Sequence, residues 1–136
     1  MAGTQELNIT LASSANGKPR VMVVDDEEPI RRMLGGVLRK LGCGVDTACC
    51  AAEAIRQLGQ VEYRLVLVDV VMPGVDGITL VQQIRERWPR TRIVVMSGKA
   101  RHEMVGRAFR NGAADFLCKP IDGEQLRHML SRYAFD

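Results

Sequence analysis

Short apolar runs alternate with amphipathic segments along most of the chain. The runs Val21–Val24, Leu65–Val68 and Ile93–Met96 are continuously apolar, which is typical of strands buried on both faces of a sheet. Segments at 44–48 and 115–118 fit two further, shorter strands. After each of the five comes a segment with apolar residues at helical spacing. This alternation predicts a doubly wound α/β fold, in which a parallel sheet carries helices on both faces.

The first predicted helix carries signals for both of its ends. Pro29 suits a first helical position, and Gly42 suits a residue that ends a helix. Gly35 and Gly36 lie inside this helix, where each costs about 1 kcal/mol relative to alanine. Close packing of the helix against the sheet is one explanation for both glycines.

Residues 1–19 differ from the rest of the chain. Serines, Asn16, Gly17 and Pro19 are typical of a linker. Before them, Leu7–Leu11 alternates apolar and polar side chains like a short strand, which fits either the last strand of a preceding domain or a tail. We therefore expect a flexible tail or linker at 1–19 and one folded domain at 20–136.

Composition excludes two broad classes of protein. A hydrophobic content of 46% is enough for a core, so wholesale disorder is excluded, and an aromatic content of 4% favours buried aliphatic strands. No apolar run approaches the roughly 18 residues that a membrane span needs. The first residues also lack the basic start and the apolar stretch of a signal peptide. We expect a cytoplasmic domain without membrane contact.

Four arginines form a cluster at 85, 87, 90 and 92. One interpretation is a phosphate-binding patch. A solvated helix end and loop is the favoured interpretation, because the sequence shows no aromatic or glycine platform that accompanies these charges.

The four cysteines are Cys43, Cys49, Cys50 and Cys118. Their spacing is not that of a metal site. Reduced thiols that fill small apolar sites are the favoured interpretation.

Polar residues stand where the predicted strands end, which is where ligands bind in doubly wound folds. Asp25 and Asp26 follow the first strand, and Asp69 ends the third. Ser97 ends the fourth strand, and Lys119 follows the fifth. Three carboxylates in one crevice raise one another's pKa unless a cation compensates. Hard oxygen ligands suit Mg²⁺, so the sequence predicts a magnesium site at this edge.

The acidic run Asp25–Glu28 also excludes alternatives. A flavin or dinucleotide site on this architecture needs a glycine-rich loop at this position, and carboxylates would repel its phosphates. No P-loop is present either, so an NTPase is disfavoured.

Four motifs occur in order at the strand ends: Val23–Glu28, Asp69–Gly77, Met96–Gly98 and Phe116–Pro120. With them, residues 20–135 resemble the receiver domain of two-component response regulators. The resemblance implies a flavodoxin-like fold with five parallel strands in the order 2-1-3-4-5.

The resemblance also implies a role for each polar residue of the site. Asp69 resembles the phosphoacceptor, which takes a phosphoryl group from a phosphohistidine as an acyl phosphate. Asp26, Asp69 and the backbone carbonyl of Val71 resemble the Mg²⁺ ligands, and Asp25 acts through a coordinated water. Lys119 would add positive charge at the transferring oxygens.

Two further positions resemble the switch of the family. The Ser97 hydroxyl would turn toward a phosphoryl oxygen once Asp69 is modified, and Phe116 occupies the paired aromatic position. Phe116 has no hydroxyl, unlike the tyrosine often found there. The peptide bond before Pro120 is usually cis in the family.

Two positions depart from the usual pattern of relatives. Val71 is apolar where many relatives carry a polar side chain, and Lys99 adds a second cation near the site. Both flank the route of water to the acyl phosphate, so we expect both to change the lifetime of the phosphorylated state.

In the family, signals leave through the face formed by the fourth helix, the fifth strand and the fifth helix. Here that face includes Arg101, Arg107, Arg110, Arg127 and Arg132. A homodimer through this face is compatible with the resemblance. The implied partner is a sensor histidine kinase or a phosphotransfer protein, and we expect no direct contact with nucleic acid.

Three origins fit the chain: a stand-alone receiver, a receiver from a longer regulator, or the receiver of a hybrid histidine kinase. The strand-like segment Leu7–Leu11 and the linker after it slightly favour the hybrid kinase.

The predicted function is a phosphorylatable switch that takes part in its own phosphorylation and dephosphorylation, not a turnover enzyme. The alternative is a phosphorylation-independent interaction module that uses the receiver fold for docking. Degenerate receivers of that kind lose the acceptor or the lysine, and this chain has Asp69 and Lys119.

Overall fold

The computed structural model describes residues 17–72, 77–98 and 102–135, with the backbone alone for His102. Strands and helices alternate along these residues, as the apolar pattern predicts. The elements are β1 (Arg20–Val24), α2 (Glu28–Lys40), β2 (Gly44–Ala48), α3 (Ala51–Leu58), β3 (Leu65–Asp69), α4 (Gly77–Arg87), β4 (Arg92–Ser97), α5 (His102–Arg110), β5 (Asp115–Cys118) and α6 (Gly123–Tyr133).

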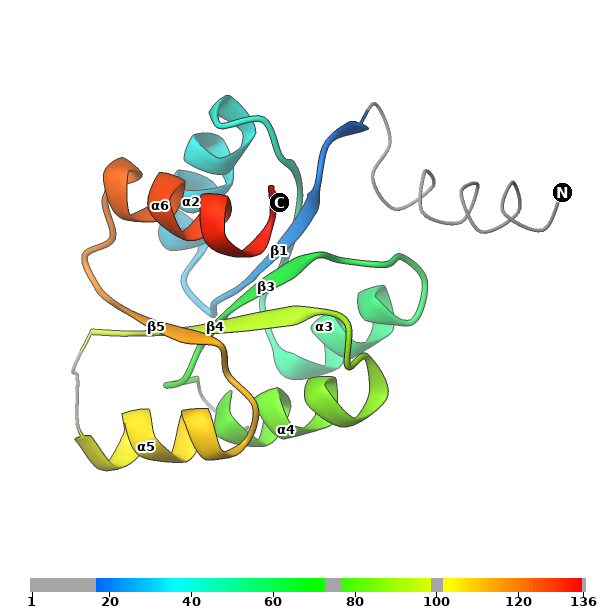
Figure 1. The fold of residues 1–136 in the computed structure, drawn as a ribbon, viewed down its shortest axis with the longest axis vertical. Coiled ribbons are helices and arrows are strands. Elements are labelled where there is room, and N and C mark those ends of the chain that lie inside the picture. Colours follow the sequence, from blue (N-terminus) through cyan, green and yellow to red (C-terminus); the bar gives the residue numbers. More distant parts are fainter. Residues whose placement is uncertain (1–16, 73–76, 99–101, 136) are drawn as a thin grey trace, which may run out of the picture.

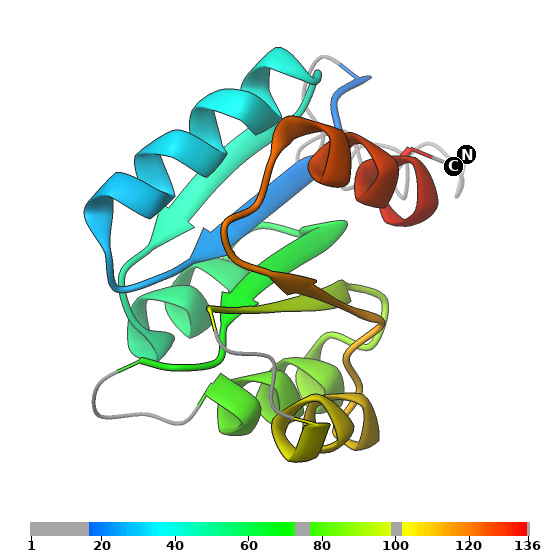
Figure 2. The same cartoon turned by 90° about the vertical axis from the view of Figure 1, so that its left-hand side faces the viewer.

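The five strands form one parallel sheet in the order β2-β1-β3-β4-β5. Helices α2 and α6 cover one face of the sheet, and α3, α4 and α5 cover the other (Figures 1 and 2). The predicted fold class and strand order are therefore confirmed.

Each face of the sheet has its own hydrophobic core, because successive side chains of a strand point to opposite faces. Val21, Val23 and Leu67 pack on the side of α2 and α6. Met22 and Val68 pack on the side of the other three helices. Burial on both faces explains why the central strands are continuously apolar rather than alternating.

The glycines of α2 fit the prediction only in part. Gly42 has a φ of 98° and ends the helix in the left-handed region, as expected. A Cβ at Gly35 would make ordinary contacts, the nearest 3.4 Å from Arg39 Nη1. A Cβ at Gly36 would meet nothing within 4 Å beyond its own helical neighbours. Close packing on the sheet is therefore the wrong explanation for Gly36.

The interpretation of the cysteines as apolar fillers holds for one of the four. Cys43 is buried in the core on the side of α2 and α6, and burial raises the pKa of its thiol to about 11. Cys49, Cys50 and Cys118 are free and exposed, which corrects the expectation for them. They lie where β2 and β5 reach their carboxyl ends, beyond the packed cores.

Several predicted features lie outside the described residues: the segment Leu7–Leu11, residues 73–76 of the second motif, Lys99 and Arg101. Of the helices that the structure describes, none combines the length and the apolarity needed to cross a membrane.

Gly77, the first residue of α4, allows this helix to begin directly against the end of β3. A Cβ at Gly77 would lie 2.5 Å from the Cα of Val70 and 2.7 Å from the carbonyl oxygen of Asp69. Both atoms belong to the backbone, so relief would require the end of β3 to move away from α4.

We therefore expect Gly77→Ala to lower the free energy of unfolding by about 1–3 kcal/mol, the usual cost of forcing extra volume into a packed region. Urea titration followed by circular dichroism measures this change. An unchanged unfolding midpoint would contradict the close approach.

Gly36→Ala is the matched control, since it makes the same chemical change in a helix with open space around it. Alanine costs less conformational entropy there, so the free energy of unfolding should rise by about 0.5–1 kcal/mol.

Candidate functional site

The carboxyl ends of β1, β3, β4 and β5 meet at one edge of the sheet, which faces the viewer in Figure 2. Asp25 follows β1, Asp69 ends β3, Ser97 ends β4 and Lys119 follows β5. A hollow of about 540 Å³ opens here. It is lined by Glu27, Asp69, Val71, Ser97, Gly98, Met104 and Lys119. Parallel strands thus bring together side chains that lie far apart in the sequence.

The Lys119 ammonium joins two buried carboxylates. Its Nζ lies 2.7 Å from Oδ2 of Asp25 and 3.4 Å from Oδ2 of Asp69. Asp25 is fully buried and Asp69 is 4% exposed. The other oxygen of each carboxylate accepts a backbone hydrogen bond, from Glu27 N–H at 2.9 Å and from Val71 N–H at 3.1 Å. Both carboxylates are therefore held in fixed orientations.

Burial and charge shift the titration of this cluster. Burial raises the pKa of Asp69, the Asp25 charge adds to the rise, and the Val71 N–H and Lys119 only partly oppose it. Burial alone would lower the pKa of Lys119, but the hydrogen bond to Asp25 and the two negative charges raise it. Lys119 is therefore a cation at neutral pH, beside the Asp69 carboxylate, which is costly to ionise.

Three acidic side chains at the start of α2 could hold a divalent cation. Each of Asp25, Asp26 and Glu27 offers a carboxylate oxygen, and these oxygens lie within 4.8 Å of one another. Carboxylate oxygens are the donors that Mg²⁺ and Ca²⁺ prefer. The sequence predicts Asp25 and Asp26 as ligands but not Glu27, although Glu27 directly follows them in the acidic motif. The structure adds Glu27 to this pair.

Ser97 and Phe116 lie on neighbouring strands. Ser97 is 1% exposed at the end of β4, and its carbonyl accepts a 2.8 Å hydrogen bond from Lys119 N–H. Phe116 is half-buried, is paired with Val95 in the sheet and packs against the core on the side of α3, α4 and α5. The peptide bond between Lys119 and Pro120 is cis, as predicted. The switching roles of Ser97 and Phe116 stay predictions.

Two apolar side chains border the hollow. Val71 is 61% exposed, an unusual exposure for a valine, and stands beside Asp69. Met104, from α5, is half-buried on the lining. Helical spacing places Met104 on the apolar side of its helix but gives no sign that it reaches the site. Only the packing of α5 against the sheet shows this.

The sequence profile of the family described as "Response regulator receiver domain" matches residues 21–131. The chain belongs to this family. Receiver domains serve two-component signal transduction, so the family that the sequence motifs predict is confirmed. The match covers the five strands, apart from Arg20 at the start of β1, and most of the last helix.

Individual relatives agree with this assignment. The transcriptional regulatory protein ResD of Bacillus subtilis is 35% identical over 107 residues, which cover 79% of this chain and 44% of ResD. The chain spans less than half of the length of the first curated relatives that it matches.

Solved structures share the fold. Chemotaxis protein CheY4 of Vibrio cholerae superposes with a TM-score of 0.81 at 28% identity, covering 85% of this chain and 98% of CheY4. A response regulator protein from Burkholderia pseudomallei, solved with a phosphorylated aspartic acid, a calcium ion and citrate, superposes with a TM-score of 0.77 at 27% identity. That match covers 80% of this chain and 64% of the Burkholderia chain.

The raised pKa of Asp69 predicts a pH-dependent stability difference for Asp69→Asn. The free energy of unfolding of both proteins should agree well below pH 3.8, where Asp69 is protonated when folded and unfolded. As pH rises from 3.8 toward the raised folded pKa, the unfolded state releases its proton first. The wild type therefore loses stability over this window, and the neutral variant becomes the more stable. Urea titrations between about pH 2.5 and pH 8 measure the difference.

Glu62→Gln, at an exposed position away from the site, is the control and should show little change with pH. A wild type that gains stability over Asp69→Asn as pH rises would contradict the assigned shift.

Proposed function

We propose that this receiver domain is a phosphoacceptor switch, which accepts a phosphoryl group on Asp69 from a phosphohistidine of a sensor histidine kinase or a phosphotransfer protein. The observation that carries the proposal is the position of Asp69 between an open hollow and the Lys119 ammonium. One carboxylate oxygen is held by the Val71 N–H, and the other lies 3.4 Å from Lys119.

The transfer exchanges one bond for another. An Asp69 carboxylate oxygen forms a bond to phosphorus as the phosphorus–nitrogen bond of the phosphohistidine breaks, and the electron pair of that bond stays on the imidazole nitrogen. The second ring nitrogen of the phosphohistidine carries a proton, so the ring leaves as neutral imidazole. The products are an acyl phosphate on Asp69 and a neutral histidine on the partner. Phosphoryl transfer needs mainly positioning and charge compensation, and Lys119 supplies a fixed positive charge.

The carboxylates near Asp69 fit a divalent cation. We propose Mg²⁺, held by Asp26, Asp69 and the Val71 carbonyl, with Asp25 acting through a water and Glu27 beside them. When bound, Mg²⁺ would neutralise charge on the phosphoryl oxygens. The Burkholderia relative supports this proposal, because its structure holds a calcium ion and a phosphorylated aspartic acid.

Ser97 and Phe116 would transmit the effect of acyl phosphate formation to the face formed by α5, β5 and α6, which we call the output face. We propose that the Ser97 hydroxyl moves to a phosphoryl oxygen and that Phe116, two pairs away in the sheet, repacks against α5. The face formed by α5, β5 and α6 then changes. Exposed Phe109 and Arg110 lie on this face and would contact an output partner or a second copy of the domain.

A phosphorylation-independent docking module is the second candidate. The Lys119 cluster disfavours it, since a buried pair of carboxylates costs stability and a docking platform does not need them. The extent of the receiver domain at 20–136, the linker at 1–19 and the hybrid-kinase origin stay predictions.

Incubation with Mg²⁺ and acetyl phosphate or phosphoramidate, followed by intact mass measurement, tests the acceptor. The wild type should gain one phosphoryl group, and Asp69→Asn should gain none. Asp115→Asn, at the opposite end of the strands, is the matched control and should be modified like the wild type. Removing Mg²⁺ with EDTA should abolish the adduct.

An adduct on Asp69→Asn equal to that on the wild type would reject Asp69 as the acceptor. Absence of any adduct on the wild type would favour the phosphorylation-independent module.

Val71→Asn should shorten the lifetime of the phosphorylated state. Val71 and Met104 form an apolar border around Asp69, and a polar side chain there would bind a water near the acyl phosphate. Single-turnover dephosphorylation, followed by intact mass, measures the lifetime. An equal lifetime for both proteins would show that Val71 does not control access of water.

A further inference from the structure

Two adjoining hollows lie at the amino ends of the strands, away from Asp69. The basic hollow, about 610 Å³, is lined by Arg85, Pro89, Arg90, Thr91, Arg92, Ile93 and residues 112–114. The tryptophan hollow, about 340 Å³, is lined by residues 58–62 and 87–91. The two share Pro89, Arg90 and Thr91, so they form one continuous surface. Arg92 opens β4, which ends at Ser97, so this surface and the phosphorylation site lie at opposite ends of the sheet.

Arg85 is held in place on the wall of the basic hollow. Its Nη1 donates a 3.0 Å hydrogen bond to the Pro89 carbonyl, which uses one of five guanidinium N–H donors. Its aliphatic part crosses Gly112, where a Cβ would lie 2.6 Å from Arg85 Cγ. Gly112 also has a φ of 115°, which favours glycine. The chain thus leaves room for the arginine and fixes the position of its charge.

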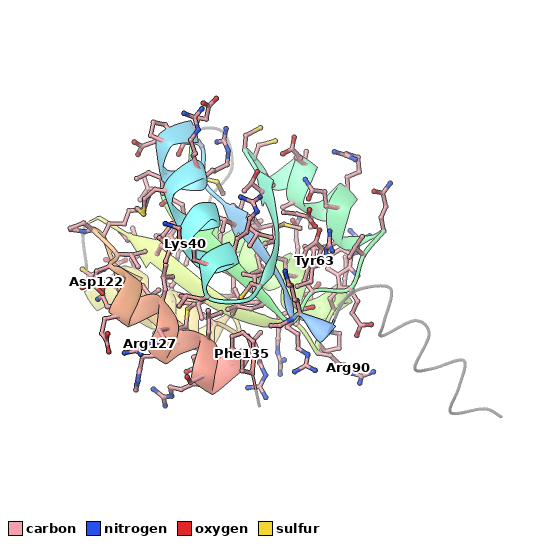
Figure 3. The ribbon with its side chains drawn as sticks, turned by 90° about the horizontal axis from the view of Figure 1, so that it is seen from above. Lys40, Tyr63, Arg90, Asp122, Arg127 and Phe135 are labelled. Atoms are coloured by element: carbon pink, nitrogen blue, oxygen red, sulfur yellow. The ribbon has the colours of Figure 1, made fainter. Side chains whose placement is uncertain are left out.

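Arg90 and Arg92 add two exposed guanidinium groups to the same hollow, and Figure 3 shows Arg90 at the rim of the molecule. No carboxylate belongs to the lining of this hollow in the part of the chain that the structure describes. Arg20 and Arg127, in contrast, each form an ion pair with an acidic residue. The lining of this hollow therefore has an excess of positive charge, which favours a ligand that carries negative charge.

The wall of the basic hollow offers few other donors. The N–H of Ala113 donates to the Ala108 carbonyl, and the N–H of Ala114 donates to the Ile93 carbonyl. Recognition therefore rests on the arginine side chains, which suit carboxylate and phosphate oxygens.

The tryptophan hollow has a different character. Trp88 is half-buried, and the Arg87 guanidinium lies 4.7 Å from the centroid of its ring. Leu58 and Val61 add aliphatic surface, and Glu62 contributes one carboxylate. The expectation of a solvated helix end without an aromatic platform is wrong. Trp88 lies within the arginine cluster, directly after Arg87, and its ring contacts the Arg87 guanidinium.

We propose that the two hollows form a docking surface for an acidic protein segment with an apolar anchor residue. Its carboxylates would bind Arg85, Arg90 and Arg92, and its anchor would enter the tryptophan hollow. A nucleic acid fits less well, because its uninterrupted phosphate charge would meet Glu62 beside Trp88. A peptide can place acidic and apolar side chains separately.

Trp88 reports on this surface directly, since it is the one tryptophan of the chain. The probe is a synthetic peptide in which Asp and Glu residues flank Leu-Phe, titrated while the Trp88 emission is followed. We expect a saturable change that weakens with added salt. The peptide with Asn and Gln in place of its acidic residues should give no saturable change.

Charge-removing variants test the assignment of the arginines. The double variant Arg90→Gln/Arg92→Gln should bind the acidic peptide about tenfold more weakly, through loss of two charge-assisted contacts. Arg32→Gln, an exposed arginine on α2 outside both hollows, should bind like the wild type. Circular dichroism confirms that each variant is folded.

Three outcomes would overturn the proposal: equal binding of the acidic and amide peptides, equal binding by the double variant and the wild type, or tighter binding of a single-stranded oligonucleotide than of the peptide. Asp69→Asn should bind the peptide like the wild type. Success or failure here is therefore separate from success or failure of the phosphoacceptor assay.

Discussion

The ion cluster of Lys119 with Asp25 and Asp69 is the constraint on which the rest of the site depends. Two carboxylates in a buried position cannot both stay ionised without a nearby cation. Lys119 meets this need from the end of β5, 2.7 Å and 3.4 Å from the two oxygens. The cluster exists only when β1, β3 and β5 end at the same edge of the sheet. The chemistry of the site therefore depends on the parallel arrangement of these strands.

The sheet separates two kinds of surface. Its carboxyl ends carry buried acids around one lysine, and its amino ends carry exposed arginines beside Trp88. The central strands between them are mainly apolar and carry a hydrophobic core on each face of the sheet. With the functions proposed above, this separation would let a phosphoryl group at Asp69 and a partner at the amino ends act on the same domain without competing for side chains.

Much of the fold and the site could be predicted from the sequence, because local signals were strong. Continuous apolar runs marked the strands, and polar residues at their ends marked the site. Some interpretations were wrong where they depended on the neighbours that a residue meets in space. Gly36 faces no close neighbour, and three of the four cysteines are exposed. Met104 lines the hollow because α5 packs over the end of β4, which helical spacing cannot show.

The sequence by itself determined the number and order of strands and helices, the family, and the residues gathered at the carboxyl edge. These follow from short-range periodicity and from motifs read in order. Only the tertiary structure decided which oxygen of Asp69 faces Lys119, that Glu27 joins the acidic group, and that Arg85 and Trp88 border one surface. Such facts depend on distances between segments far apart in the chain, and those distances are set by packing.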